Sequence, residues 1–252
     1  MSHIKPVFRY IEEQEKAKFS QSQCLLTISV GQEVHEGEKF ASTIELINSA
    51  FNSCIMLIDD SLQRHTMAIN TTQNADFFYE PSIKEGDLWL TRNEQHYSKL
   101  TILKKIIRWD TWLTHPNYID KQKELKILIE NDMNYQGVFE STITEFLRRY
   151  YERLQETAGF DMQKARQLCF DYLLEECTAM CLWPELSCHF EVYPSRRNQV
   201  MDETHKRFVL PYYSDLLHAV GIKFKNRKQL KPQYFEALKE KKEKRVNEPL
   251  ME

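Results

Sequence analysis

The chain has 252 residues, of which 42% are hydrophobic and 12% aromatic, so it can bury a substantial core. Glycine and proline are few, and no Gly/Ser-rich or Pro-rich linker divides the sequence. No apolar run approaches the length of a membrane span, and residues 1–22 lack a long apolar signal region. We therefore predict one cytoplasmic domain over 1–252 without a membrane partner, with a peripheral segment at 1–22 and a basic tail at 223–252.

The net charge of −3 is unevenly distributed. Between residues 223 and 245, ten Lys and Arg accompany three Asp and Glu, so this segment carries +7 and the rest of the chain −10. A basic tail on an acidic body is typical of phosphate binding, although a solvated tail is the simpler interpretation of the charge alone.

The six cysteines form no Cys-x-x-Cys pair, and we expect reduced, mostly buried thiols. Cys177, Cys181 and Cys188 lie near His189, but their spacings match no zinc pattern. No metal site is therefore predicted.

In chain order, the first elements predict a parallel sheet. Residues 24–29 form an apolar run typical of a buried strand, 36–51 carry apolar residues at helical spacing, and 54–59 form a second buried run. Strand, helix and strand in so short a segment make a βαβ unit, whose crossover is right-handed. Ser29 ends the first strand and Gly31 follows, so we expect the Ser29 hydroxyl at the sheet edge where ligands bind in open α/β folds.

The rest of the chain is predicted to be mostly helical. Residues 61–70 are expected to form a loop or helix, and 72–93 show no regular pattern. A late strand is predicted at 187–193, where polar and apolar residues alternate. Further helices are expected at 93–113, 120–131, 136–157, 161–182 and 206–220.

Two late segments carry residues suited to chemistry. Tyr172 and Glu176 are four apart on a predicted helix, where a phenol and a carboxylate on one face can hold an ammonium group. Tyr193 ends the late strand, which Pro194 terminates. Taken singly, a surface carboxylate beside a half-buried tyrosine and an aromatic sheet-edge residue are the simpler interpretations. Glu175 is expected to face solvent.

The polar segment after the second strand offers a partner for Ser29. His65 lies in it, and a Ser29–His65 pair would suit a serine hydrolase. Ser29 is not set in Gly-x-Ser-x-Gly, however, so a nucleophile elbow is poorly supported. The sequence also contains no Gly-x-Gly-x-x-Gly and no Walker A motif, which argues against the usual nicotinamide and ATP chemistries.

Taken together and in this order, these segments resemble the tRNA-dependent cyclodipeptide synthases, over residues 24 to about 215. The segments that carry the resemblance are Leu25–Gly31 with Ser29, HEGEKF at 35–40, DSLQRHT at 60–66, Tyr172 with Glu176, and Tyr193-Pro194. The resemblance implies an α/β fold with a Rossmann-like parallel sheet flanked by helices, similar to the catalytic domain of class I tyrosyl- and tryptophanyl-tRNA synthetases. It implies no cofactor and no ATP, because the aminoacyl-tRNA substrate is already activated.

The family has two branches that differ at three signature positions. One branch has Asn three residues after the serine and Tyr-Gln at the late strand. This chain has Gln32 and Tyr193-Pro194 instead, so it resembles the branch marked by Tyr-Pro. No role can be carried from that Asn to Gln32.

The resemblance also implies a mechanism. Ser29 attacks the ester of one aminoacyl-tRNA and becomes aminoacylated, while Tyr172 and Glu176 hold the α-ammonium. The second aminoacyl-tRNA supplies an amine that attacks acyl-Ser29, and the resulting dipeptidyl-enzyme cyclises onto its own ester to give a diketopiperazine. Glu176 acts as base in peptide transfer and Tyr193 relays a proton in cyclisation. A monomer that binds two aminoacyl-tRNAs is expected.

The residues around Ser29 predict the first aminoacyl pocket. Leu25 and Thr27 share its strand face, and Leu57 lies on the next strand, which suggests a mostly apolar pocket. Glu191 faces the same way as Tyr193 and would admit a polar side chain. Substrate contacts are also expected from Gly31, Gln32 and Pro194, and backbone N–H groups near Gly31 are expected to stabilise an oxyanion.

Transfer RNA requires a basic surface, because phosphate contacts supply much of the affinity. The leading candidates are Lys99, Lys104, Lys105 and Arg108 on the helix expected at 93–113. Arg148, Arg149 and the basic tail are candidates for the second tRNA. Two alternatives stay open, namely a serine hydrolase that uses Ser29 with His65, and a non-catalytic tRNA-binding module.

Overall fold

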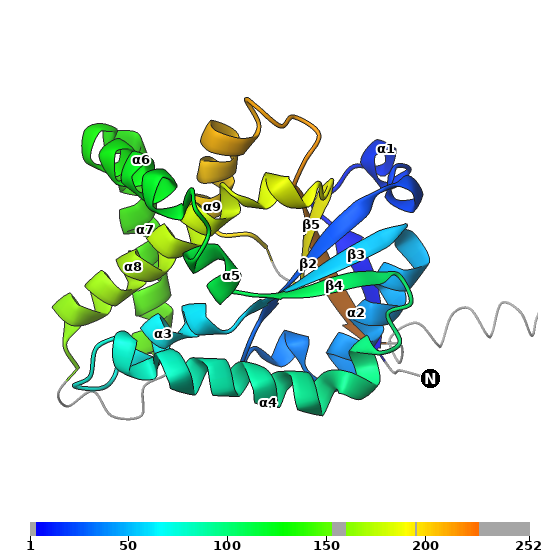
Figure 1. Cartoon of the computed structure of the whole chain (residues 1–252), viewed down its shortest axis with the longest axis horizontal. Helices are drawn as coiled ribbons and strands as arrows, with labels where there is room; N and C mark the ends of the chain where they lie inside the picture. The colour runs from blue at the N-terminus through cyan, green and yellow to red at the C-terminus, as the bar shows by residue number, and fades with distance from the viewer. Residues whose placement is uncertain (1–3, 153–159, 195, 227–252) are drawn as a thin grey trace, which may run out of the picture.

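The computed structural model describes residues 4–152, 160–194 and 196–226 (Figure 1). Its centre is a six-stranded sheet in the order β1-β6-β5-β2-β3-β4. Strands β2 to β6 pair in parallel, and only β1 runs antiparallel, along β6. The strands are β1 (Ile4–Arg9), β2 (Gln23–Ser29), β3 (Ser53–Asp59), β4 (Leu103–Arg108), β5 (Phe190–Tyr193) and β6 (His218–Asn226). This architecture confirms the predicted parallel α/β fold.

Helices cover both faces of the sheet (Figure 1). The α-helices are α1 (Glu13–Lys16), α2 (Gly37–Ala50), α3 (Arg64–Ala68), α4 (Tyr79–Tyr97), α5 (Asp110–Leu113), α6 (Tyr118–Asn131), α7 (Met133–Tyr151), α8 (Met162–Met180) and α9 (Gln199–Thr204). Short 3-10 turns and a π-helical turn (His205–Val209) connect several of them. Helices α2 and α4 pack on one face, and α6, α7 and α8 pack on the other.

Strand alternation divides the apolar core between these two faces. Leu26 and Ile28 of β2 belong to the core beneath α2 and α4, where Phe40 and Trp89 are fully buried. Leu25 points to the opposite face and joins the core of α6, α7 and α8. Parallel strands covered on both faces become nearly continuous apolar runs, which is why β2 and β3 were recognisable in the sequence.

Three predicted elements are wrong. Residues 93–113 do not form one helix: α4 ends at Tyr97, and β4 and α5 follow. The segment 72–93, expected to be irregular, contains most of α4. The helix predicted at 206–220 is limited to a π-helical turn before Pro211, because proline cannot continue a helix, and β6 begins at His218.

The described residues contain no group of His, Cys, Asp and Glu side chains arranged to bind a metal ion. All six cysteines are free thiols, and five of them are buried. Within the described ranges, no helix is both long and apolar enough to cross a membrane. Residues 1–22 contribute β1 and α1, and of the predicted basic tail only 223–226 lie within the described residues, in β6.

Candidate active site

Ser29 lies at the carboxyl end of β2, in the middle of the sheet. Its hydroxyl is 3.3 Å from the Tyr193 hydroxyl of β5 and donates a 3.5 Å hydrogen bond to Asp59 Oδ2 of β3. Parallel pairing brings these strand ends together, because Ser29 is in register with Asp59. Ser29 is only 8% exposed, so it is held by its neighbours and is not a free turn residue.

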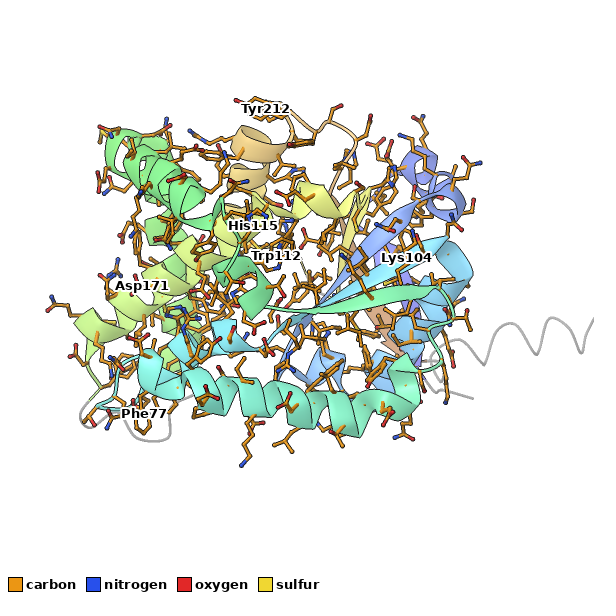
Figure 2. The ribbon with its side chains drawn as sticks, viewed as in Figure 1. Phe77, Lys104, Trp112, His115, Asp171 and Tyr212 are labelled. Carbon is orange, nitrogen blue, oxygen red and sulfur yellow. The ribbon has the colours of Figure 1, made fainter. Side chains whose placement is uncertain are left out.

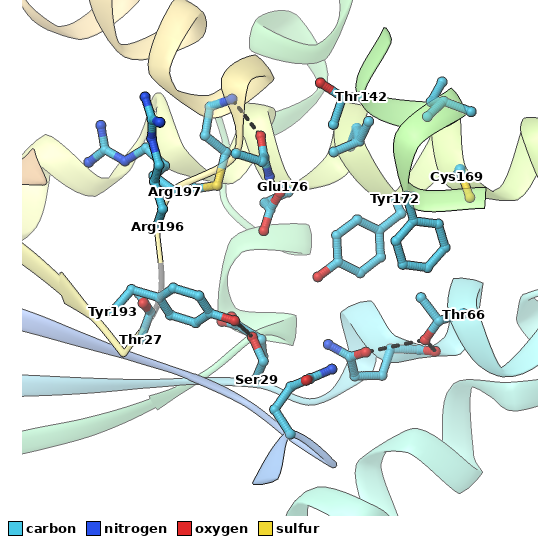
Figure 3. A pocket seen from close by; sticks show the side chains of 18 of the residues that line it. Thr27, Ser29, Thr66, Thr142, Cys169, Tyr172, Glu176, Tyr193, Arg196 and Arg197 are labelled. Carbon is cyan, nitrogen blue, oxygen red and sulfur yellow. Dashed lines mark hydrogen bonds between the residues drawn. The ribbon is translucent and has the colours of Figure 1, made fainter. Parts of the chain in front are cut away.

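A cavity of about 310 Å³ opens over these strand ends (Figure 3). Strands β2, β3 and β5 form its floor, α7 and α8 form one wall, and the segment after β5 forms another. Its lining includes Thr27, Ser29, Gln32, Asp59, Gln63, Ile143, Phe146, Arg149, Tyr172, Leu173, Glu176, Glu191, Tyr193, Arg196, Arg197 and Asn198. Its volume is that of a small-molecule site.

Helix α8 presents Tyr172 and Glu176 to this cavity, as their spacing predicts (Figure 3). Glu176 Oε2 accepts a 3.0 Å hydrogen bond from Asn198 Nδ2. Burial raises the pKa of Glu176 to about 7, and the hydrogen bond from Asn198 partly opposes this shift. Burial also raises the pKa of Tyr172, against a hydrogen bond with Gln63. A carboxyl group that titrates near neutrality can accept or release a proton at physiological pH.

Glu175 does not face solvent as predicted. It is 5% exposed and forms an ion pair with Arg64, whose Nη1 lies 2.7 Å from Glu175 Oε1. Trp109 donates a 2.8 Å hydrogen bond from Nε1 to the same oxygen, and His65 Nε2 lies 3.3 Å from Oε2. The spacing of α8 placed Glu175 on a polar outer face. Its buried partners come from far away in the sequence: Arg64 and His65 follow β3, and Trp109 follows β4.

His65 is therefore not placed as a base for Ser29. Its ring nitrogen contacts Glu175, whereas the side-chain partners of the Ser29 hydroxyl are Asp59 and Tyr193. The described structure contains no Ser29–His65 pair of the kind that the hydrolase alternative needs.

A second charged pair lines the wall beside β5. Glu191 of β5 is ion-paired with Arg197, and both side chains are 4% exposed. Arg197 also donates a 2.9 Å hydrogen bond to the Leu217 carbonyl, while its Nε is buried without a partner. The guanidinium is thus fixed in place, and this part of the cavity is polar.

The predicted pocket residues divide into two groups. Thr27, Gln32 and Glu191 line the cavity. Leu25 and Leu57 do not: both are fully buried in the core below, so the prediction of an apolar pocket built from these strands is wrong. The reason is that the cavity lies beyond the strand ends, and its apolar lining includes Ile143 and Phe146 of α7 and Leu173 of α8.

Gly31 and Pro194 lie beside the cavity, outside its lining. Gly31 has a φ of +85°, in the left-handed region that favours glycine, and forms the turn after β2. The Gln32 N–H donates to the Ser29 carbonyl at 3.2 Å and closes this turn, so it is not available to an oxyanion. Pro194 is buried directly after Tyr193.

The four cations predicted to bind tRNA lie on β4 and just before it. Lys104 lies at the end of β4 away from α7 and α8 (Figure 2) and donates a 2.7 Å hydrogen bond to Gln23. Arg108, at the other end of β4, is ion-paired with Asp60 and with Asp87, the latter at 2.7 Å. The remaining two are Lys99, in the turn after α4, and Lys105, which is exposed on β4. They do not form a basic helix.

The sequence predictions missed much of the lining, including the polar residues Asp59, Gln63, Arg197 and Asn198. Asp59 had a usable signal, because it ends the second apolar run as Ser29 ends the first, and parallel pairing places two such ends together. Arg197 and Asn198 come from an irregular segment after β5, where no periodicity indicates a side-chain direction.

No protein-family model matches the sequence, and no curated protein matches it either. Solved structures do. A cyclodipeptide synthase from Fluoribacter dumoffii is 43% identical with a TM-score of 0.84, and the match covers 88% of this chain and 98% of that one.

More distant structures share the fold. A cyclodipeptide synthase from Candidatus Glomeribacter gigasporarum, solved bound to Phe-tRNAPhe, is 15% identical with a TM-score of 0.66 over 79% of this chain and 86% of that one. A Mycobacterium tuberculosis protein, whose structure relates cyclodipeptide synthetases to type I tRNA synthetases, is 12% identical with a TM-score of 0.59. The match covers 88% of this chain and 93% of that one. At 43% identity over nearly the whole Fluoribacter chain, with the same fold, this chain belongs to the cyclodipeptide synthase family of aminoacyltransferases.

Proposed function

We propose that this cyclodipeptide synthase joins the aminoacyl groups of two aminoacyl-tRNAs by ping-pong catalysis through acyl intermediates on Ser29. The observation that carries the proposal is the position of the Ser29 hydroxyl, which lies at the floor of a cavity shared with Tyr172, Glu176 and Tyr193. A nucleophile, a carboxyl group that titrates near pH 7 and a phenol thus surround one space large enough for an amino acid.

In the first half-reaction, Ser29 Oγ attacks the ester carbonyl of the first aminoacyl-tRNA. The Oγ–carbon bond forms, the bond from carbon to the ribose oxygen breaks, and the Ser29 proton ends on that oxygen. One ester replaces another, so the step needs no ATP and no other cofactor. Glu176 and Tyr172 hold the α-ammonium, because an ionised carboxylate and a phenol oxygen both accept its protons.

The second half-reaction requires a correction of the expected direction of attack. If the amine of the second aminoacyl-tRNA attacked acyl-Ser29, the dipeptide would be left on the tRNA. The dipeptide remains on Ser29 only if the amine of the acyl-enzyme is the nucleophile. Glu176 accepts a proton from this amine, which then attacks the ester carbonyl of the second aminoacyl-tRNA. The peptide bond forms, the bond from that carbon to the ribose oxygen breaks, and a further proton of the amine ends on that oxygen as the tRNA leaves. The amine of the resulting dipeptidyl group next attacks the ester at Ser29 and closes the diketopiperazine ring. Tyr193, 3.3 Å from Ser29 Oγ, relays a proton as this oxygen leaves.

The acceptor end of the tRNA enters past two arginines that line the cavity, Arg149 of α7 and Arg196 of the segment after β5. Both side chains are exposed, and Arg196 lies over the ring of Tyr10 at 5.8 Å. Guanidinium groups bind phosphate through paired hydrogen bonds, which suits them to the phosphates near the 3′ end. Lys99, Lys104 and Lys105 remain candidates for contacts farther along the tRNA.

Two further proposals rest on the sequence. The first is that the chain is a member of the branch marked by Tyr-Pro, which Tyr193-Pro194 and Gln32 support; Gln32 also lines the cavity. A monomer is sufficient for the reaction, because every residue used above comes from one chain. No observation favours the hydrolase, since His65 is bound to Glu175.

The function is tested by expressing the protein in bacteria and analysing the medium for diketopiperazines by mass spectrometry. We expect a cyclodipeptide from the wild-type protein and none from Ser29→Ala, which should still bind aminoacyl-tRNA. Cyclodipeptide from Ser29→Ala would refute the assignment of the nucleophile. Hydrolysis of simple esters without tRNA would favour the hydrolase, and tRNA binding without any product would favour the binding module.

A further inference from the structure

Asp59 is the acidic residue that contacts the nucleophile. It ends β3 as Ser29 ends β2, and parallel register places the two residues opposite each other. Ser29 Oγ donates to Asp59 Oδ2 at 3.5 Å, which is long for a formed hydrogen bond. Catalytic hydrogen bonds are often long before substrate binds and shorten in the reacting complex.

The other carboxyl oxygen of Asp59 is unsatisfied. Asp59 lines the cavity and is only 5% exposed, and its Oδ1 is buried without a hydrogen-bond partner among the described residues. Leaving a buried polar atom unpaired costs stability, so its presence at a cavity indicates a use other than folding.

The neighbouring Asp60 provides the contrast. Its carboxylate accepts hydrogen bonds from the Ser61 N–H at 2.8 Å and the Trp109 N–H at 3.3 Å, and it is ion-paired with Arg108. Asp60 is therefore a structural residue with its partners in place, whereas the one side-chain partner of Asp59 among the described residues is Ser29.

The charges around Asp59 are mostly negative. Burial raises its pKa, and the nearby carboxyl groups of Glu176, Asp60 and Glu191 raise it further, against the hydrogen bond from Ser29. A carboxylate in such surroundings binds a proton more strongly than one in water, and this makes it a better general base.

The other groups near Ser29 suit this role less well. Burial raises the pKa of Tyr193 to about 12, so its hydroxyl is protonated at neutral pH and can donate but not accept the Ser29 proton. Glu176 comes from α8, on a different wall of the cavity (Figure 3), where it is bound to Asn198 and assigned to the substrate amine.

We propose that Asp59 is a further catalytic residue, which carries the Ser29 proton during acylation. This role rests on the proposed function. As the bond from Ser29 Oγ to the ester carbon forms, Asp59 Oδ2 accepts the hydroxyl proton. As the bond from that carbon to the ribose oxygen breaks, Asp59 returns the proton to that oxygen. The carboxylate is regenerated, so one ester is exchanged for another with no net proton.

The test is Asp59→Asn, which keeps size and hydrogen bonding but cannot accept the proton. Acylation is measured in a single turnover with radiolabelled aminoacyl-tRNA, by trapping the labelled protein in acid. We expect the rate to fall roughly 100-fold or more, the usual contribution of a general base, while tRNA affinity stays within about twofold. The variant should fold, because it removes a buried charge that has no cationic partner.

Asp60→Asn is the matched control: it removes a carboxylate next along the chain that does not touch Ser29. It should lower the melting temperature, by breaking the ion pair with Arg108, and slow acylation at least tenfold less than Asp59→Asn does, because Asp60 acts on Asp59 only through its charge. A second measurement uses the Ser29→Cys background. A thiol ionises far more readily than a hydroxyl and depends less on a base. Asp59→Asn should therefore lower the acylation rate much less in the Ser29→Cys protein than in the wild-type protein.

The proposal is overturned if Asp59→Asn acylates within about threefold of the wild-type rate. It is also overturned if Asp59→Asn lowers acylation equally in the wild-type and Ser29→Cys backgrounds, because a structural defect would affect both alike. A wild-type protein that forms no acyl-enzyme would instead contradict the proposed function of Ser29.

Discussion

Arg64 and Glu175 form a buried bidentate ion pair that joins the segment after β3 to α8. One of its two hydrogen bonds is 2.7 Å long, and the side chains are 12% and 7% exposed. Glu175 directly precedes Glu176, so the pair fixes the turn of α8 that carries the carboxyl group of the site. The DSLQRHT segment thus holds in place the helix that carries Tyr172 and Glu176.

Breaking this pair should cost far more stability than breaking a surface pair. We expect Arg64→Met to lower the free energy of unfolding by roughly 3–5 kcal/mol, because the buried Glu175 charge loses its bidentate arginine partner. The control is Arg148→Met on α7, whose partners Glu145 and Glu152 are exposed, and where we expect a loss below about 1 kcal/mol. Urea denaturation measures both, and equal losses would contradict the role of the buried pair.

The carboxyl group of Glu176 should control the pH dependence of catalysis. Its pKa of about 7 means that it is largely protonated at pH 6 and ionised at pH 8, and only the ionised form holds an ammonium or accepts a proton. Cyclodipeptide formation should therefore rise with pH through about 7. Glu176→Gln should reduce the rate of cyclodipeptide formation about 100-fold or more and remove its rise with pH. Steady-state assays from pH 6 to 8 measure both effects.

The same substitution should stabilise the protein at high pH. The folded state holds the Glu176 proton more tightly than the unfolded state, so the wild-type protein loses stability from about pH 4.5 to 7, and the loss is constant above that. Glu176→Gln avoids this loss, which is on the order of 3 kcal/mol. Its melting temperature should exceed that of the wild-type protein at pH 8 and approach it near pH 5; a lower value at pH 8 would argue against the raised pKa.

Salt dependence should distinguish the two candidate tRNA surfaces. The double variant of Arg149→Ala with Arg196→Ala should weaken tRNA binding. It should also reduce the slope of log affinity against log salt concentration by about one to two, because each lost phosphate contact lowers the magnitude of this slope by about 0.7–0.9. The matched pair, Lys104→Ala with Lys105→Ala, lies toward the amino end of β4, away from the cavity. A larger effect from the lysines would place the main RNA contact on β4.

Two glycines should respond to alanine in opposite directions. Gly137 is exposed on α7 with open space around its α-carbon, so Gly137→Ala should stabilise the protein by about 0.5–1 kcal/mol through helix propensity. Gly86 is buried on α4, where an added Cβ would lie 2.6 Å from Arg108 and Asp60 atoms. Gly86→Ala should therefore destabilise it by at least 1 kcal/mol, as overpacking does. Thermal denaturation checks both signs.

The elements that the sequence predicts well are those with a buried, regular pattern. Strands β2 and β3 are continuous apolar runs, and α2 and α8 repeat apolar residues at helical spacing. Strand β4 was missed because it is a sheet edge, where Lys104 and Lys105 face solvent and resemble one side of a helix. Helix α4 was missed because Pro81 and Gly86 disturb its pattern, although proline is tolerated in a first turn and Gly86 is needed for close packing.

The candidate site was predictable where it depends on strand ends and helix spacing, and unpredictable where it depends on register and loops. Ser29 and Tyr193 both end predicted strands, and a parallel sheet brings such ends to one edge. The pairing of Ser29 with Asp59 required the register of two strands. Arg197 reaches Glu191 from an irregular segment, through a contact that no local pattern encodes.

The antiparallel pairing of β1 with β6 has a consequence for how the chain folds. Ile4 pairs with Asn226, so one edge of the sheet is assembled from strands more than 200 residues apart. Closing so long a loop is slow, because its entropy must be lost before the contacts form. During synthesis, β1 emerges from the ribosome first but has no partner until β6 follows. This edge should therefore be the last part of the sheet to form.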